Sequence, residues 1–522
     1  MATNKDNVVL SPHLLYRSSD LELDQKLTQR WVAIFSDIGM NLIIERMAMG
    51  DERVKGVCER VLAIGLSNLD DIKYRQDVIR DGIKNKDTIR KLYTKLNDTI
   101  DKARKQLFWL GSSSPEYSLY ESISILKFYV SFLSYLREIA EANYKEFNSE
   151  GFQTLFINII NKFNENYLNE IVENLNRLEF PNGVKVSGKL GRDCELTELK
   201  LVKPESRRPW ALNISRLSER KLTYVLPERD ESGFQELAGI KNKSLLPVTI
   251  ALKSATDNLL NFVNSLLLEL SFIIGCINLY EDLTMRGGAI IFPELRPTEE
   301  YALGFEGLYD ISLFIKIKDK VVSNSLEPGH QKLIMITGAN RGGKSTFLRS
   351  IGQSLIMMKA GMFVAAKKFV ASIFTSIHTH FKREEEREMT MGKLDEELER
   401  MNLILDEVTK GSVILFNESF ASTNAIEASQ IAGGIISGLV EKGARVIYVT
   451  HIYELASQFL DRFSGDVRFL VAERLDTGER TFRIVEGIPT STSYADDLFR
   501  KIFEPNMEKV VTSSKPGDAD NL

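Results

Sequence analysis

The chain has 522 residues, which is long enough for two to four domains, each with its own hydrophobic core. A hydrophobic content of 43% and a charged content of 27% are ordinary for soluble globular proteins. The net charge of −5 argues against a protein that is coated in nucleic acid over its whole surface.

The cysteines and the apolar segments bear on location. Cys58, Cys194 and Cys276 are far apart and lack metal-binding or redox spacing, which is typical of a reduced intracellular protein. Residues 1–7 are polar and lack the apolar core of a signal peptide. The most hydrophobic stretch, 266–280, contains Glu269 and is too short to span a bilayer. We expect a cytoplasmic protein with no membrane partner.

Residues 1–180 are predicted to form a helical region. Glycine and proline are sparse there, and apolar residues recur at helical spacing. Two runs show this spacing: Leu119, Ile123, Leu126, Val130 and Leu133, and Tyr167, Ile171 and Leu175.

A different pattern follows over residues 181–247, with shorter, strand-like runs and several prolines. Between positions 185 and 221 there are ten basic and five acidic residues, so this segment is a basic patch on an acidic protein. Such a patch is a candidate contact to a nucleic-acid backbone, although a solvated basic surface is an equal alternative. The candidate DNA contacts are Arg207, Arg208, Arg216 and Lys221.

Helix is expected to return over residues 248–300, and residues 301–505 then alternate apolar strands with helices. This alternation predicts an α/β domain with a mainly parallel sheet. The strand candidates are 333–337, 413–416, 446–450, 467–471 and 481–485. Residues 506–522 are expected to form a disordered tail.

A phosphate-binding loop is the most specific motif in the chain. It reads Gly338, Ala339, Asn340, Arg341, Gly342, Gly343, Lys344 and Ser345, followed by Thr346. The motif lies between a predicted strand and a predicted helix, which is the context that phosphate binding needs; the alternative is a glycine turn that matches by chance. Lys344 is expected to reach the β- and γ-phosphates of ATP and Ser345 to hold Mg²⁺.

The strand over 413–416 leads into Asn417 and Glu418. In an ATPase site the first of two acidic residues orients the water shell of Mg²⁺, and the second positions the attacking water. Asn417 cannot supply that negative charge, whereas Glu418 stands where a general base is expected. The alternative for Glu418 is a surface residue at a capped strand end.

His451 ends the strand candidate 446–450. At that place it can sense the γ-phosphate or the attacking water, although a lone histidine is often structural. The charged segment 384–408 between these elements has apolar residues at helical spacing, as an amphipathic surface helix does.

Together these motifs resemble the MutS family of DNA mismatch-repair ATPases. The resemblance is carried by residues 336–349 around the phosphate loop, by 418–423 and by 449–455 around His451. By the same resemblance Asn324, in the run 321–324, contacts adenine, and residues 66–79 look like the start of the helical core.

The resemblance implies a multidomain fold: an α-helical core and lever, a small β-rich clamp-like insertion at 181–247, and then an α/β P-loop ATPase domain. It also implies a homodimer that forms through the ATPase domains and a clamp that binds DNA of unusual or branched structure through backbone contacts.

Three departures from the family pattern are visible. The chain begins almost directly on the helical core, which leaves no room for a mismatch-reading or connector domain, and the Phe-x-Glu runs at 163, 234, 292 and 416 read as chance. Asn417 replaces an acidic residue. The segment 391–395 lacks the hydroxyl that the family's trans-acting loop carries.

The sequence therefore favours an ATP-hydrolysing DNA clamp that does not read mismatches by the usual wedge. The alternative is a nucleotide-binding assembly switch with weak or no hydrolysis, which Asn417 favours. An ABC-type ATPase of chromosome maintenance ranks below both, because its signature motif and a long coiled coil are missing.

Overall fold

The computed structural model describes residues 11–19, 21, 27–109, 114–180, 183–190, 192, 196–202, 227, 229–317, 320–383, 392–462, 466–475 and 480–489. Two compact units are present. One comprises Met1–Leu21 and Lys84–Leu270, and the other comprises Glu22–Ile83 and Ser271–Leu522. The division falls at the end of α4 (Leu69–Lys84) and inside α9 (Glu231–Met285).

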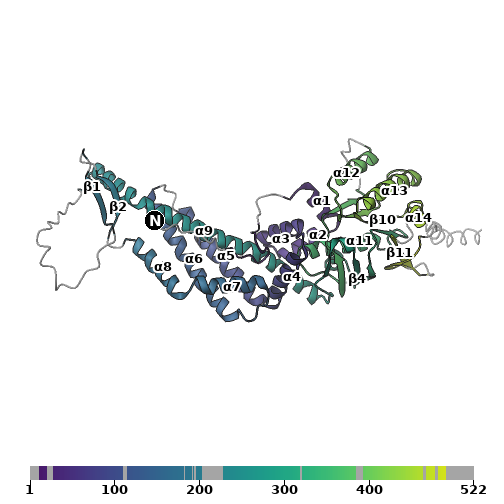
Figure 1. Ribbon diagram of the computed structural model, residues 1–522, viewed down its shortest axis with the longest axis horizontal. Helices are drawn as coiled ribbons and strands as arrows, with labels where there is room; N and C mark the ends of the chain where they lie inside the picture. Colours follow the sequence, from purple (N-terminus) through teal and green to yellow (C-terminus); the bar gives the residue numbers. More distant parts are fainter. Residues whose placement is uncertain are drawn as a thin grey trace, which may run out of the picture. The chain divides into compact units, whose positions relative to one another are not determined.

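The first unit is mainly helical (Figure 1). It contains α5 (Lys86–Trp109), α6 (Pro115–Asn143), α7 (Glu150–Lys162), α8 (Glu165–Leu178), the strands β1 (Val186–Leu190) and β2 (Leu196–Leu201), and the first part of α9. The two strands pair in an antiparallel sheet. All the residues of the first apolar run from the sequence are buried on α6, and Leu175 of the second run packs against them, whereas Tyr167 is exposed.

The predicted β-rich segment is wrong for residues 231–247, which form the first turns of α9. The Asp230 side chain starts this helix by accepting a hydrogen bond from the Gly233 amide at 2.9 Å. Pro247 lies inside the helix, whereas helix was expected to return only from residue 248. The helical pattern therefore continues through a residue that usually interrupts it.

The second unit contains four N-terminal helices and the whole α/β part. The helices are α1 (Gln29–Asp37), α2 (Met40–Ala48), α3 (Glu52–Ile64) and α4. The sequence grouped residues 1–180 together, but residues 22–83 belong with the α/β part. They are held there by long-range hydrogen bonds, such as the one that the Leu66 amide donates to the Lys359 carbonyl at 2.9 Å.

The main sheet of this unit has six strands in the order β12-β11-β6-β10-β9-β8. The strands are β6 (Leu333–Thr337), β8 (Ile377–Phe381), β9 (Val413–Asn417), β10 (Arg445–Val449), β11 (Val467–Arg474) and β12 (Arg480–Glu486). All neighbours are parallel except β11 and β12. The predicted mainly parallel sheet and its five strand candidates are confirmed.

Helices cover this sheet (Figure 1). They are α11 (Lys344–Lys359), α12 (Lys393–Glu407), α13 (Ala425–Glu441) and α14 (Tyr453–Arg462). Leu333 and Met335 of β6, with Phe416 of β9 and Tyr448 of β10, share one buried cluster with apolar residues of α12, α13 and α14.

A second sheet of four strands in the order β3-β7-β4-β5 was not predicted. It consists of β3 (Glu294–Arg296), β4 (Leu303–Leu308), β5 (Asn324–Gly329) and β7 (Lys368–Ser372), with the 3₁₀ turn η3 (Thr298–Glu300) and the short helix α10 (Ile311–Lys316) beside them. Gly304 and Gly307 interrupt β4, which weakens the sequence signal of a strand.

Among the described residues, α9 alone is long and apolar enough to cross a bilayer. Because 72% of its most apolar window is buried within the protein, a core helix accounts for it.

The two buried histidines of β8, His378 and His380, lead us to expect that the protein loses stability in acid. Burial lowers the pKa of His378 to about 3 and that of His380 to about 4, with nearby arginines adding to both effects. Both are therefore neutral in the folded protein, whereas an unfolded chain protonates them near pH 6.5. Stability should be lost as the pH falls below about 6.5, by up to about 1.4 kcal/mol per pH unit for each histidine.

Urea denaturation of the intact chain at several values between pH 7.5 and pH 5 measures this loss. A variant with His378→Asn and His380→Asn should show a shallower fall in the free energy of unfolding over that range. An unchanged slope would mean that these two groups are not the source of the acid sensitivity.

Candidate functional site

The phosphate loop follows the central strand β6, whose five residues are all buried, and leads into α11. Gly338 has φ 118° and Gly343 has φ 93°, a region that side chains disfavour. A Cβ at Gly342 would lie 2.9 Å from both the Ala339 carbonyl oxygen and the Ala472 Cβ. The loop is therefore packed closely against β11, and its glycines are required by space as well as by conformation.

Lys344 is the first residue of α11 and is only 4% exposed. Its Nζ donates to the carbonyl oxygens of Gly338 at 2.9 Å and Ala339 at 3.0 Å. Burial lowers the pKa of Lys344, against the opposing effect of Glu418. The ammonium group is thus held inside the loop by two acceptors, which phosphate oxygens can replace.

A cavity of about 420 Å³ opens beside this loop. Its wall includes phosphate-loop residues, Glu418, and residues of β4, α10, β5 and β12. The predicted residues that line it are Asn324, Arg341, Gly342, Gly343, Lys344, Ser345, Thr346 and Glu418. Gly338, Ala339 and Asn340 lie in the loop without lining the cavity, and Asn340 is exposed.

Asn324 and two aromatic residues also line the cavity. The Asn324 Oδ1 accepts a hydrogen bond from the Ile484 amide of β12 at 2.7 Å, which fixes the orientation of the side-chain amide. Tyr309 and Phe482 also line the wall, and Phe482 is 49% exposed with φ 58°. Sequence reasoning missed both aromatic rings, which offer flat apolar faces to a base. The only sequence feature that could have pointed to Phe482 is its position as an aromatic residue in a strand at the edge of the sheet.

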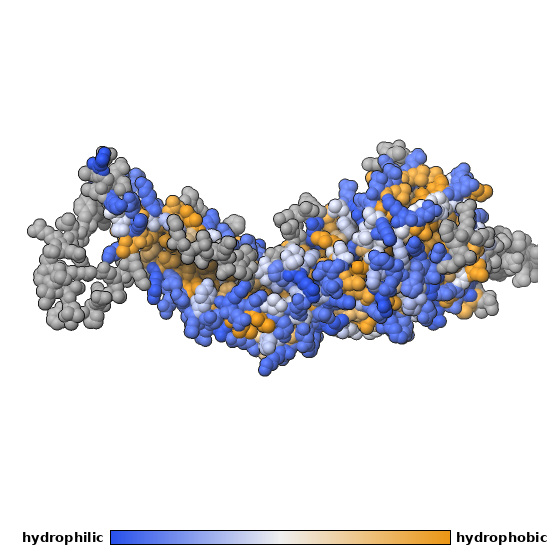
Figure 2. Space-filling view, in the orientation of Figure 1, coloured by the Kyte–Doolittle hydropathy of each residue, from blue (hydrophilic) through white to orange (hydrophobic). Residues whose placement is uncertain are grey.

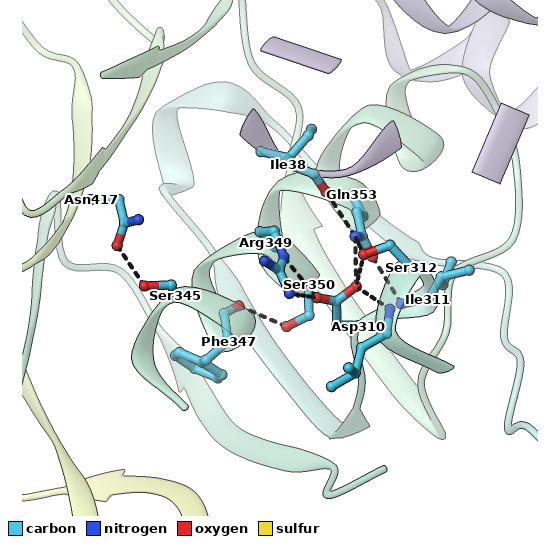
Figure 3. A network of polar contacts seen from close by, with 11 residues as sticks. Ile38, Asp310, Ile311, Ser312, Ser345, Phe347, Arg349, Ser350, Gln353 and Asn417 are labelled. Atoms are coloured by element: carbon cyan, nitrogen blue, oxygen red, sulfur yellow. Dashed lines mark hydrogen bonds and ion pairs between the residues drawn. The ribbon is translucent and has the colours of Figure 1, made fainter. Parts of the chain in front are cut away.

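The Ser345 hydroxyl donates to the Asn417 Oδ1 at 2.8 Å, so the structure brings these two predicted residues together (Figure 3). They come from α11 and the end of β9, which are far apart in the sequence. Both present oxygen atoms of the hard type that Mg²⁺ prefers, and Glu418 is the next residue in the chain. The donor set therefore fits a magnesium ion that also takes water and phosphate oxygens. In the part of the chain that the structure describes, no group of three or more His, Cys, Asp or Glu residues could hold a metal.

Glu418 and His451 lie beside each other at the ends of β9 and β10. The Glu418 Oε1 and the His451 Nδ1 are 3.8 Å apart, which is too long for a good hydrogen bond. The polar contact with His451, together with Lys344, holds the pKa of the Glu418 carboxyl below its usual range, although burial acts in the opposite direction. Glu418 is therefore ionised at neutral pH, as a general base must be.

A network around Asp310 was not predicted (Figure 3). Arg349 of α11 donates to the Asp310 Oδ2 from Nε at 2.9 Å and pairs with it through a second nitrogen at 2.8 Å. The Asp310 Oδ1 accepts from Gln353 Nε2 at 2.8 Å and from Ser312 Oγ at 2.6 Å. The Gln353 side chain also donates to the Ile38 carbonyl at 2.8 Å. Through these contacts α11 is tied to the cavity wall and to the turn between α1 and α2.

The proposed DNA contacts Arg207, Arg208, Arg216 and Lys221 lie outside the described residues, as do Cys194 and residues 506–522. Of the ten basic residues in that segment, Lys185, Lys189, Arg192 and Lys200 are described. Lys189 forms an ion pair with Glu198 across the two-stranded sheet at 2.7 Å.

Asp310 gives a stability prediction. Its side chain is fully buried, and replacing it with asparagine would leave an amide group facing the Arg349 guanidinium. Breaking one partner of a buried ion pair costs about 3 kcal/mol or more. We expect Asp310→Asn to lower the free energy of unfolding by about that amount, measured by urea denaturation.

Asp77→Asn is the matched control, because Asp77 pairs with Arg80 on the surface, where both side chains are more than half exposed. An exposed pair contributes about 0–1 kcal/mol. Equal losses in the two variants would contradict a special role for the Asp310 network.

Two family models match the chain, and several known proteins are similar to part of it. The family model of the MutS2 N-terminal domain matches residues 67–286, and that of MutS domain V matches residues 334–496. The Endonuclease MutS2 of Shouchella clausii is 31% identical over 173 residues, which are 33% of this chain and 22% of that protein. The DNA mismatch repair protein MutS of Thermus aquaticus is 31% identical over 186 residues, 35% of this chain and 22% of that protein.

A third relative, the Endonuclease MutS2 of Geobacillus thermodenitrificans, is 32% identical over 187 residues, 35% of this chain and 24% of that protein. The matched segments thus span about a quarter of the length of these relatives. The two family models cover most of the helical region and the α/β region that carries the phosphate loop, and on this basis the chain belongs to the MutS family.

Proposed function

We propose that the chain is an ATP-dependent DNA-binding protein of the MutS type that hydrolyses ATP to switch a dimeric DNA clamp. One observation carries the proposal: Lys344 and Ser345 at the start of α11 line the same cavity as Glu418, which follows the end of β9. A phosphate-binding cation, a magnesium ligand and an ionised carboxylate are the groups that hydrolysis of the β–γ bond needs.

In this proposal the chain's own groups act on the phosphates and on water. Lys344 leaves the Gly338 and Ala339 carbonyls to stabilise charge on the β- and γ-phosphates. Glu418 positions the attacking water and accepts its proton, and His451 senses the γ-phosphate or the same water. Bound Mg²⁺ would neutralise the charge that develops on the phosphate oxygens, held by Ser345 with Asn417 and Glu418 in its outer shell.

The adenine base would lie against Asn324, whose side chain is oriented by the Ile484 amide. The exposed Phe482 ring lines the same cavity. A fixed amide reads the edge of a base, while an aromatic face packs on its plane. ATP with Mg²⁺ is thus the cofactor set that we propose.

The lever, the clamp and the dimer belong to the same proposal. The antiparallel strands β1 and β2 lie in the predicted clamp segment, which also carries the basic residues. A homodimer through the ATPase domains is supported by exposed apolar side chains: Leu403 on α12 is 63% exposed and Ile426 on α13 is 65% exposed. Figure 2 shows apolar surface over this part of the α/β region. Contiguous apolar surface on a soluble protein can mark a protein interface.

The proposed partners are therefore DNA of unusual or branched structure, bound through its backbone, and a second copy of the chain. We do not include mismatch reading by the usual wedge. We place the protein in the cytoplasm and not in a membrane, in line with the burial of α9.

An alternative function is a nucleotide-binding assembly switch with weak or no hydrolysis. Asn417 favours it, because a neutral amide takes the place of the carboxylate that normally orients the magnesium water shell. Changes of this kind around a metal commonly cost about 10- to 100-fold in affinity or activity.

The first experiment measures ATP turnover by the purified protein with and without branched DNA. We expect Lys344→Ala to weaken ATP binding, and Glu418→Gln to retain binding while turnover falls by at least about 100-fold, the usual scale of a lost general base. Lys367→Ala is the matched control for Lys344→Ala, because Lys367 is an exposed lysine outside the cavity wall.

Turnover that survives both substitutions would exclude this site as the source of hydrolysis. Tight ATP binding without turnover in the unaltered protein would support the assembly switch instead. Turnover that DNA does not change would contradict the DNA clamp.

A second experiment restores the missing charge. Asn417→Asp keeps an oxygen in place to accept from Ser345 and adds a carboxylate beside the magnesium position. We expect turnover to rise about 10-fold or more and the Mg²⁺ concentration for half-maximal activity to fall. Unchanged magnesium dependence would show that Asn417 does not limit the reaction.

A further inference from the structure

The turn that carries Glu418 has an unusual backbone. Glu418 has φ 53° and Phe420 has φ 60°, both in the left-handed region that non-glycine residues rarely adopt. The residue between them, Ser419, is only 1% exposed, and Phe420 is fully buried. Such a turn persists only when its surroundings hold it firmly, so the contacts of Ser419 and Phe420 decide where Glu418 points.

His380 of β8 supplies most of these contacts. Its Nδ1 lies 2.8 Å from the Ser419 Oγ, and the Ser419 hydroxyl also donates to the His380 carbonyl at 2.5 Å. The imidazole stacks on the Phe420 ring, with 5.1 Å between the ring centres and 20° between the planes. On the other side of the turn, the Tyr448 hydroxyl donates to the Ser419 carbonyl at 2.9 Å.

The second nitrogen of His380 reaches α12. The His380 Nε2 lies 3.0 Å from the Glu397 carbonyl oxygen, so Nε2 carries the hydrogen and donates it there. Nδ1 then accepts, and the Ser419 hydroxyl lies within reach of both Nδ1 and the His380 carbonyl. The Ser422 hydroxyl adds a second link, since it donates to the Glu397 Oε1 at 3.0 Å.

We propose that His380 is a positioning residue for hydrolysis: it holds the strained 418–420 turn through Ser419 and links that turn to α12. The proposal rests on the proposed function of Glu418. A movement of α12 would reach Glu418 through one imidazole and one hydroxyl. The whole of α12, which begins at Lys393, is thereby joined to the turn that carries Glu418.

The test uses His380→Phe and Ser419→Ala. His380→Phe keeps an aromatic ring against Phe420 and the main-chain carbonyl that accepts from Ser419, but removes both hydrogen bonds of the imidazole ring. Ser419→Ala removes the hydroxyl alone. A displacement of about 1 Å in a catalytic group can cost about 100-fold in rate. We expect kcat for ATP to fall by about that factor in both variants, with KM and the affinity for a non-hydrolysable ATP analogue changed less than about 2-fold. In the double variant kcat should fall little further than in either single variant, because both changes remove the same contact, that between the His380 ring and the Ser419 hydroxyl.

His378→Phe is the matched control. His378 is equally buried on the same strand, but its Nε2 contacts Ser376 and not the turn. A merely structural histidine would lower stability and leave kcat of the folded protein unchanged. An equal loss of kcat in His378→Phe, or an unchanged kcat in Ser419→Ala, would overturn the proposal; Ser419→Ala decides if His380→Phe does not fold.

Failure of the proposed function would give a different result from failure of the role of His380. If the unaltered protein does not hydrolyse ATP, or if Glu418→Gln retains full turnover, the catalytic role of Glu418 fails. Crystal structures of the two variants then test the positioning itself. The 3.8 Å separation of Glu418 Oε1 and His451 Nδ1 should change by more than about 1 Å, and an unchanged separation and φ at Glu418 would overturn the role of His380.

Discussion

Backbone hydrogen bonds between β6, β10 and β9 hold the site together. The ladder continues past the strand ends, where the Thr450 amide donates to the Ile336 carbonyl at 3.0 Å and the Glu418 amide donates to the Val449 carbonyl at 2.9 Å. Because the carboxyl ends of parallel strands meet at one edge, the residues after three strands converge there. The pairing of β6 with β10 and of β10 with β9 therefore places His451 and Glu418 beside the phosphate loop.

The helix after the loop is fixed along its length. At its start, Gly342 and Gly343 pack against Ala472 and Phe482 so closely that a side chain would collide. Further along, Arg349 and Gln353 bind Asp310, whose carboxylate is buried and fully surrounded by donors. Any nucleotide that changes the position of α11 must therefore also act on the cavity wall and on the turn between α1 and α2.

Environment gives three histidines different properties. His378 and His380 are buried on β8 and neutral, so they act as fixed hydrogen-bonding groups. His451 is 43% exposed and lies 3.8 Å from the Glu418 carboxylate. Burial therefore distinguishes the two structural histidines from His451, which is exposed enough to contact a substrate. Position in the sequence alone does not make that distinction.

Local patterns made much of this molecule predictable. Short apolar runs gave the five strands of the main sheet, and the glycine motif gave the loop, because each depends on residues adjacent in the chain. The predicted return of helix at residue 248 was wrong, because α9 begins after Asp230 and continues through Pro247. The glycine-interrupted second sheet gave no usable signal.

The sequence by itself determined the class of site that we propose: a loop of the phosphate-binding pattern, a hydroxyl proposed for magnesium and a carboxylate that follows another strand of the same sheet. Only the tertiary structure decided how these groups are held. Asp310 meets Arg349, His380 meets Ser419, and Asn324 meets the backbone of β12. Each pair joins residues that are distant in the chain, so no local pattern records it. The contacts exist because burial leaves a polar group no partner except another part of the protein.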